Sequence, residues 1–231
     1  MERSIVYWIR AEYRKNPPAR IAQDASAADT LKAAMRRLGK RWQRRFDKLA
    51  VELAEYFAKT SQDRVDGALR DMLRRGGFTV RFKPTPAMRD AFDAVVADNA
   101  ALIRSLPAQY LKSVEGDIMR SVMAGRDLGS LAKTMRETYG VTRRRAALIA
   151  KTQNNMATAA FSRQRHLDIG VTRARWLHSS GGVQPRPEHV AFSGKTYDIR
   201  KGAYLEGKWT LPGMEINCRC VSIPIIPGFE E

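Results

Sequence analysis

The chain has 231 residues, 44% of them hydrophobic, which is enough to bury one large core or two smaller ones. No run of 18 apolar residues could span a bilayer, and Arg10 and Glu12 break the short apolar stretch near the start, so we expect neither a membrane anchor nor a secretory signal. Lysine and arginine outnumber aspartate and glutamate by 41 to 24, a net charge of +17 that favours a polyanionic partner such as nucleic acid. The positive charge could instead serve solubility or docking to an acidic protein surface.

The first 28 residues are expected to form an extended or mobile arm, because Asn16-Pro17-Pro18 disfavours helix on either side. From Leu31 to Tyr56, apolar residues then recur every three or four positions, which predicts a long amphipathic helix. The opposite face of this helix is cationic and carries Arg36, Arg37, Lys40, Arg41, Arg44, Arg45 and Lys48. This face could bind phosphate or a protein partner, or it could simply be solvated.

Further helices are expected over 61–75, 87–105, 107–124 and 127–138, with a short strand at 78–82. Gly76-Gly77 would stop the first of these helices, and Pro107 fits the first turn of another. Thr142 is expected to cap a longer helix that runs to about Asp168 and is rich in small apolar residues.

The pattern changes after Gly170, where strands are expected at 171–178, 195–199, 208–211 and 218–226, and a single turn at 185–191. We therefore predict an α+β fold, with an arm (1–28), a basic helical region (29–140) and a small C-terminal module (141–231). In this module a long helix would pack on a short mixed or antiparallel sheet.

Both cysteines of the chain, Cys218 and Cys220, are two positions apart, so on a strand their sulfurs would point to one face. Together with His189 or His178 they could supply three ligands of a zinc ion. The alternative is a pair of small buried thiols. We expect no cofactor, with zinc at His189, Cys218 and Cys220 as the one alternative considered.

An enzymatic alternative uses Asp198, Glu206 and Lys208. Two carboxylates could hold magnesium while the lysine stabilises developing charge, as in a metal-dependent enzyme that acts on nucleic acid. Glycines around these residues favour a simple hairpin instead.

The order and spacing of residues in the last third resemble the Mu F-like family of phage head morphogenesis proteins, also called minor capsid proteins. The resemblance is carried by Trp176, His178, Arg186, His189, Pro212, Gly213, Asn217, Cys218 and Cys220. Residues 149–155, with Ala157 and Ala160, look like the family's Ala-Arg-Thr-Glu-x-x-x-Ala helix, so the resemblance covers about 141–223. Gln153 replaces the family's glutamate, and residues 181–186 lack its Asp-x-Arg run, so any role of those acids in relatives does not carry over.

The resemblance implies a structural virion or prohead protein rather than an enzyme, present in few copies and oligomeric within the virion. Its implied partners are the portal protein, major capsid or scaffold proteins, and packaged double-stranded DNA; its location is the phage head, and the host cytoplasm during assembly. An arginine-rich surface would bind this DNA without reading its sequence. We expect the contacts at Arg36, Arg37, Lys40, Arg41, Arg44, Arg45, Arg143, Arg144 and Arg145. An acidic portal or scaffold protein would fit the same surface.

Overall fold

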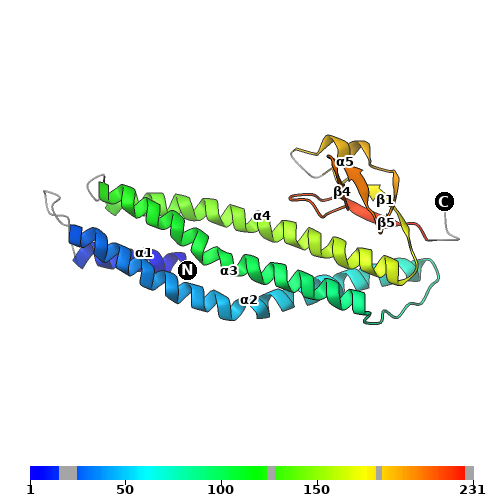
Figure 1. Cartoon of the computed structure of the whole chain (residues 1–231), viewed down its shortest axis with the longest axis horizontal. Helices are drawn as coiled ribbons and strands as arrows, with labels where there is room; N and C mark the ends of the chain where they lie inside the picture. The colour runs from blue at the N-terminus through cyan, green and yellow to red at the C-terminus, as the bar shows by residue number, and fades with distance from the viewer. Residues whose placement is uncertain (16–24, 124–127, 181–183, 227–231) are drawn as a thin grey trace. The chain divides into compact units, whose positions relative to one another are not determined.

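The computed structural model describes residues 1–15, 25–123, 128–180 and 184–226 (Figure 1). Long helices come first and a small antiparallel module follows, so the predicted α+β class is confirmed. The elements are α1 (Glu2–Lys15), α2 (Ala25–Arg75), α3 (Pro86–Met123), α4 (Leu128–Asp168), β1 (Arg173–Leu177), α5 (Pro187–Ala191), β2 (Thr196–Asp198), β3 (Ala203–Leu205), β4 (Lys208–Thr210) and β5 (Val221–Pro224). Within these described ranges, no helix combines the length and apolar character needed to cross a membrane.

The N-terminal segment differs from the expected extended arm, because Glu2–Lys15 forms α1. Ile5 and Ile9, one helical turn apart, are both fully buried, and burial of this apolar face stabilises the helix. The Asn16-Pro17-Pro18 segment lies outside the described residues.

The breaks predicted between consecutive helices are wrong. α2 continues through the stretch between residues 56 and 61, α3 continues through Pro107, and α4 continues through Gly140. Apolar residues on both sides of the last two positions are buried, among them Tyr110 beyond Pro107 and Met135 before Gly140. Tertiary packing of this kind outweighs the local cost of a proline or glycine.

The helix end predicted at Gly76-Gly77 is confirmed, and the change of pattern after Gly170 also follows a helix end; the two ends use the same backbone arrangement. Gly77 and Gly170 have φ values of 86° and 81°, which glycine adopts without strain. At each site the next amide donates to the carbonyl five residues earlier, from Phe78 to Leu73 and from Val171 to His166. The strand predicted at 78–82 is not formed.

The chain divides into two compact units. Unit 1 comprises Met1–Glu52 and Ala100–Ala147, and unit 2 comprises Leu53–Asn99 and Leu148–Glu231. The helices α2, α3 and α4 therefore each contribute one part to unit 1 and another to unit 2. The core of unit 1 consists of Ile5, Ile9, Met35, Leu38, Tyr110, Val114, Ile118 and Met135.

The helical part of unit 2 is centred on Phe161 of α4, which is fully buried and stacks on Phe92 of α3 with ring centroids 6.4 Å apart. Met88 and Val65 complete this core together with the small residues Ala58 and Ala157. The small side chains allow the close helix packing that the composition of α4 predicts.

Unit 2 also contains the C-terminal sheet, in which β1 lies between β2 and β5 and is antiparallel to both. Alternate residues of β1 point inward, so Ala174 and Trp176 are buried. A separate hairpin joins β3 and β4; the strand β3 was not predicted. β5 begins only at Val221, so Cys218 and Cys220 lie in the loop before it rather than on the strand.

Candidate functional site

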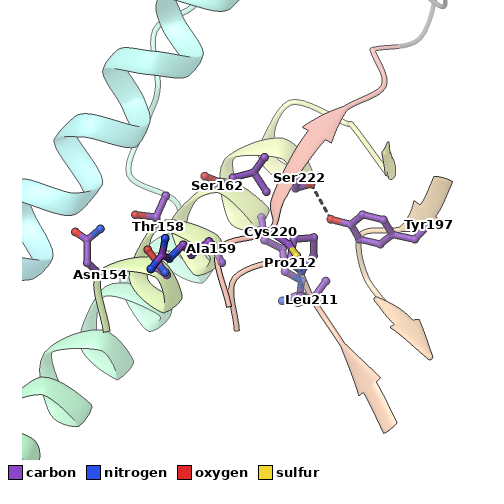
Figure 2. Close-up of a pocket in the computed structure, with 13 residues that line it drawn as sticks. Asn154, Thr158, Ala159, Ser162, Tyr197, Leu211, Pro212, Cys220 and Ser222 are labelled. Atoms are coloured by element: carbon purple, nitrogen blue, oxygen red, sulfur yellow. Dashed lines mark hydrogen bonds between the residues drawn. The ribbon is translucent and has the colours of Figure 1, made fainter. Parts of the chain in front are cut away.

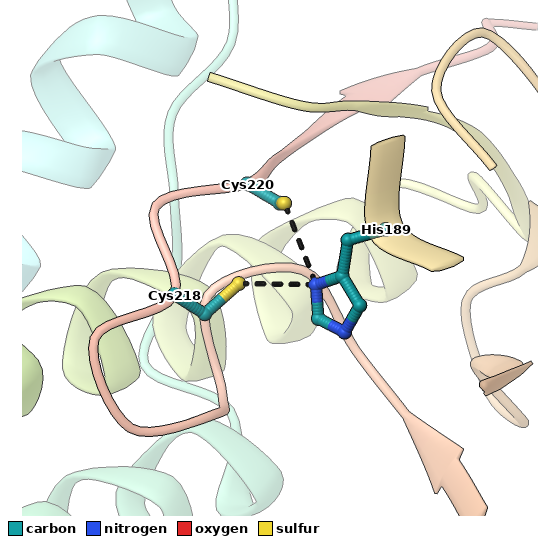
Figure 3. A group of neighbouring side chains, drawn as sticks. All are labelled: His189, Cys218 and Cys220. Carbon is teal, nitrogen blue, oxygen red and sulfur yellow. Dashed lines mark hydrogen bonds between the residues drawn. The ribbon is translucent and has the colours of Figure 1, made fainter. Parts of the chain in front are cut away.

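His189, Cys218 and Cys220 converge in the interior of the C-terminal module (Figure 3). The His189 Nδ1 atom lies 3.6 Å from the Cys218 sulfur and 3.7 Å from the Cys220 sulfur. All three donor atoms lie within 4.8 Å of one another, and the three residues are buried. The structure thus brings together the three candidate ligands that the sequence indicates, although the cysteines reach the site from a loop.

The histidine is positioned by the short helix α5 and by Trp176. Arg186, in an extended conformation, precedes Pro187 at the helix start, where proline is favoured. The Trp176 ring meets the His189 ring edge to face, with centroids 5.1 Å apart. Trp176 is fully buried and therefore fixes the imidazole from one side.

Helix α4 holds the cysteine loop in place. The Asn155 side-chain amide donates to the Cys218 carbonyl at 2.7 Å, and the Asn217 backbone amide donates to the Thr152 hydroxyl at 3.2 Å. Asn217 has a φ of 60°, a left-handed conformation that asparagine tolerates better than most residues.

Two other residues that carry the resemblance, Arg186 and Gly213, connect the loop to its surroundings. Arg186 donates to the Ile216 carbonyl at 3.1 Å and pairs with the Glu206 carboxylate at 3.3 Å. Gly213, with a φ of 84°, sits so close to Asn155 and Ala159 that an added Cβ would come within 3.3 Å of each. Pro212 next to it is also buried, so this turn packs directly on α4.

The two thiols differ in acidity because they interact. The hydrogen bond with Cys220 lowers the pKa of the Cys218 thiol to about 5, and the backbone amides of Cys220 and Gly213 act in the same direction. The same bond raises the pKa of the Cys220 thiol, and burial adds to this rise. The Cys218 thiol is therefore the more acidic of the two.

A pocket of about 200 Å³ lies beside this loop, between α4 and the sheet (Figure 2). Its lining includes Asn154, Ser162, Arg163, Tyr197 and Cys220. Arg163 is engaged by the carbonyls of residues 199 and 200, and the Tyr197 hydroxyl bonds to Ser222 at 2.7 Å. The pocket is smaller than the roughly 300–1,000 Å³ usual for sites of drug-sized ligands, so we assign it no function.

The carboxylates of the enzymatic alternative have separate structural partners. Asp198 accepts a hydrogen bond from the backbone amide of Arg200, while Glu206 pairs with Arg186. The Lys208 ammonium pairs with Glu215 at 2.8 Å, a contact that lowers the pKa of the Glu215 carboxyl. Among the described residues, His189, Cys218 and Cys220 form the one group suited to a metal, and it contains neither Asp198 nor Glu206.

His178, the other histidine considered as a ligand, is not part of that group. It is partly exposed at the end of β1, where its backbone amide donates to the Ser193 hydroxyl.

The predicted polyanion contacts all lie in unit 1, and their side chains are exposed: Arg36, Arg37, Lys40, Arg41, Arg44, Arg45, Arg143, Arg144 and Arg145. Arg45 also lies over the Trp42 ring, 5.4 Å from its centroid. In the part of the chain that the structure describes, none of these cations is paired with a carboxylate. We call this set the basic surface.

Arg165 of α4 is a buried cation that the sequence did not predict, and it joins several segments of unit 2. Its guanidinium binds both oxygens of Asp66, at 2.6 and 2.8 Å, and donates to the Lys83 carbonyl. It also contacts Asp168 and lies over the Phe82 ring, 4.9 Å from the centroid. Asp66 is 99 residues away in sequence, so no local pattern could have revealed this pair.

Residues 112–223 match the family model described as Phage Mu protein F like protein. An uncharacterized protein of Haemophilus influenzae is 29% identical over 147 residues, which cover 64% of this chain and 32% of that protein. The chain thus spans about a third of the length of this curated relative. No solved structure matches. The matched segment begins within α3, earlier than the resemblance read from the sequence, and includes the whole Cys/His cluster.

Proposed function

We propose that this chain is a phage or prophage minor head protein that takes part in head morphogenesis, because residues 112–223 match the model of the Mu F-like family of phage proteins. The family match is the observation that carries the proposal. It places the protein in the context of a virion or its assembly and supports a structural rather than an enzymatic role.

We further propose that the protein associates with the portal or with capsid or scaffold proteins. Exposed apolar side chains on the C-terminal module support a protein partner. Tyr204 and Trp209, on the β3–β4 hairpin, are 60% and 62% exposed and contact each other edge to face at 5.6 Å. Ile216, in the cysteine loop, is 68% exposed. Exposed aromatic residues of this kind are typical of interface centres.

The basic surface supports a second contact, with double-stranded DNA. Its unpaired cations are free to neutralise phosphates, and they lie on helices rather than on a shaped pocket, which suits binding without sequence preference. A protein inside a head meets phosphate at high density, so even weak contacts of this kind would be occupied.

The head assignment is tested in the phage or prophage that encodes the chain. Heads and proheads separated from free protein by sedimentation are expected to contain the chain, as detected by mass spectrometry. Deletion of its gene is expected to reduce the yield of DNA-filled heads, and expression of the gene in trans should restore that yield. Absence of the protein from all particles, together with an unchanged yield after deletion, would overturn the proposal.

A further inference from the structure

We propose that His189, Cys218 and Cys220 form a site for a single Zn²⁺ ion, bound through the His189 Nδ1 atom and both sulfurs. The site goes beyond the proposed role in head assembly, since either proposal can fail without the other.

The two sulfur–nitrogen distances fit the ligand shell of a tetrahedral zinc ion. With Zn–S of about 2.3 Å and Zn–N of about 2.0–2.1 Å, a tetrahedral ion separates a sulfur ligand from a nitrogen ligand by about 3.6 Å. The two sulfurs lie 3.6 and 3.7 Å from the Nδ1 atom, and the full set lies within 4.8 Å.

A single hydrogen bond does not account for the position of the His189 Nδ1 atom midway between the two sulfurs. An imidazole nitrogen has either one lone pair or one hydrogen, so Nδ1 can satisfy only one of two sulfurs at almost equal distances. A cation between the three atoms would satisfy all of them. Two thiolates and an imidazole favour zinc over magnesium or calcium, which prefer oxygen ligands.

The surroundings support the sulfurs as ligands. Asn155 and Thr152 of α4 fix the loop that carries both cysteines. Outer contacts of this type orient ligands before the ion binds.

Binding would form two Zn–S bonds and one Zn–N bond, release the thiol protons to solvent, and change no oxidation state. The ion would join α5 to the loop before β5, segments about 30 residues apart, and so cross-link the module. Among the described residues, no further histidine, cysteine, aspartate or glutamate joins the group, so the fourth position would hold water or another small ligand.

The first test uses the full-length wild-type protein and Co²⁺ as a spectroscopic substitute for Zn²⁺. After treatment with a chelator, addition of Co²⁺ is expected to produce the visible bands of a tetrahedral ion and a sulfur-to-cobalt charge-transfer band, saturating at one ion per chain. Zn²⁺ should then displace Co²⁺ and bleach both. Since Cys218 and Cys220 are the chain's two cysteines, Zn²⁺ should also slow the reaction of both thiols with a thiol reagent.

Variants then locate the site. Cys218→Ser, Cys220→Ser and His189→Gln should each lose the charge-transfer band or weaken Zn²⁺ binding at least tenfold. The matched control is His178→Gln, which alters the nearby histidine outside the cluster and should bind as the wild type does. Wild-type protein that shows neither the spectrum nor thiol protection would overturn the proposal whatever the variants do. A wild-type spectrum retained in His189→Gln would overturn the ligand assignment.

Discussion

The side-chain amide of Asn155 donates a 2.7 Å hydrogen bond to the carbonyl oxygen of Cys218, 63 residues later in the chain. Thr152, one helical turn earlier, accepts a bond from the backbone amide of the preceding residue, Asn217. Helix α4 is therefore hydrogen-bonded to the cysteine loop at two adjacent residues, Asn217 and Cys218. This contact gives a physical reason why the helix and the cysteine motif occur together in the family resemblance.

Replacing Asn155 by alanine is expected to weaken Zn²⁺ binding about 10- to 100-fold, because outer contacts of metal ligands typically contribute that much. Competition with a chromophoric chelator measures the change. Asn154→Ala is the matched control, since this neighbour lines the pocket but makes no described hydrogen bond to the loop. Equal affinities of the two variants would contradict the positioning role of Asn155.

Removing Asp66 is expected to destabilise unit 2 strongly. Asp66→Ala would leave the Arg165 guanidinium, whose side chain is 3% exposed, without its main counter-charge, at a cost of roughly 3–5 kcal/mol. Chemical denaturation followed by circular dichroism measures the change in the free energy of unfolding. Asp63→Ala on the same helix breaks an exposed pair with Lys59 and should cost less than about 1 kcal/mol. Similar losses in both variants would show that burial of the Arg165 pair is unimportant.

His166 should make the stability of the protein depend on pH. Burial lowers its pKa from 6.5 to about 4. Between these two values the histidine binds a proton in the unfolded chain but not in the folded chain. The free energy of unfolding is therefore not reduced by His166 above pH 6.5. It falls as the pH is lowered toward 4, by about 2 kcal/mol between pH 8 and pH 5.

The variant His166→Gln removes this titration while keeping a polar side chain. Unfolding free energies are measured for both proteins at several pH values over that range, and the wild type should lose about 2 kcal/mol relative to the variant between pH 8 and pH 5. Parallel curves would mean that His166 titrates normally in the folded protein.

Reversing charges on the basic surface tests the proposed DNA contact. The triple variant Arg37→Glu, Arg41→Glu and Arg44→Glu changes exposed positions on one stretch of α2 and should weaken binding to double-stranded DNA at least tenfold. It should also flatten the dependence of affinity on salt, because fewer counterions are released. Fluorescence anisotropy over a salt series measures both effects.

The control reverses Arg64, Arg75 and Arg89, which are exposed in unit 2 and give the same change in net charge. Equal weakening in the two triple variants would attribute DNA binding to overall charge, and unchanged binding in the first would remove the assignment.

The features that the sequence predicted well are set by local chemistry. Gly77 and Gly170 end their helices because glycine accepts the positive φ that these ends require. The strand predicted at 171–178 is present as β1, and the residue types of His189, Cys218 and Cys220 indicated a shared site.

The features that the sequence did not predict depend on distant contacts. Pro107 suggests a break in any isolated helix, but buried residues on the far side, such as Tyr110, keep α3 continuous. The cysteines approach His189 from a loop whose course is set by Asn155 and Thr152. Periodicity within a short window carries no information about such pairings.

The pairing of Arg165 with Asp66 has a bearing on how this module is inherited. The family-matched segment, 112–223, contains Arg165 and Phe161, whereas Asp66, the Lys83 carbonyl and Met88 all precede it. A recombination event that transferred the matched segment alone would deliver a buried cation without its anion and an aromatic ring without its neighbours. We therefore expect residues 53–99 to be transferred together with residues 112–223 when genes of this kind recombine.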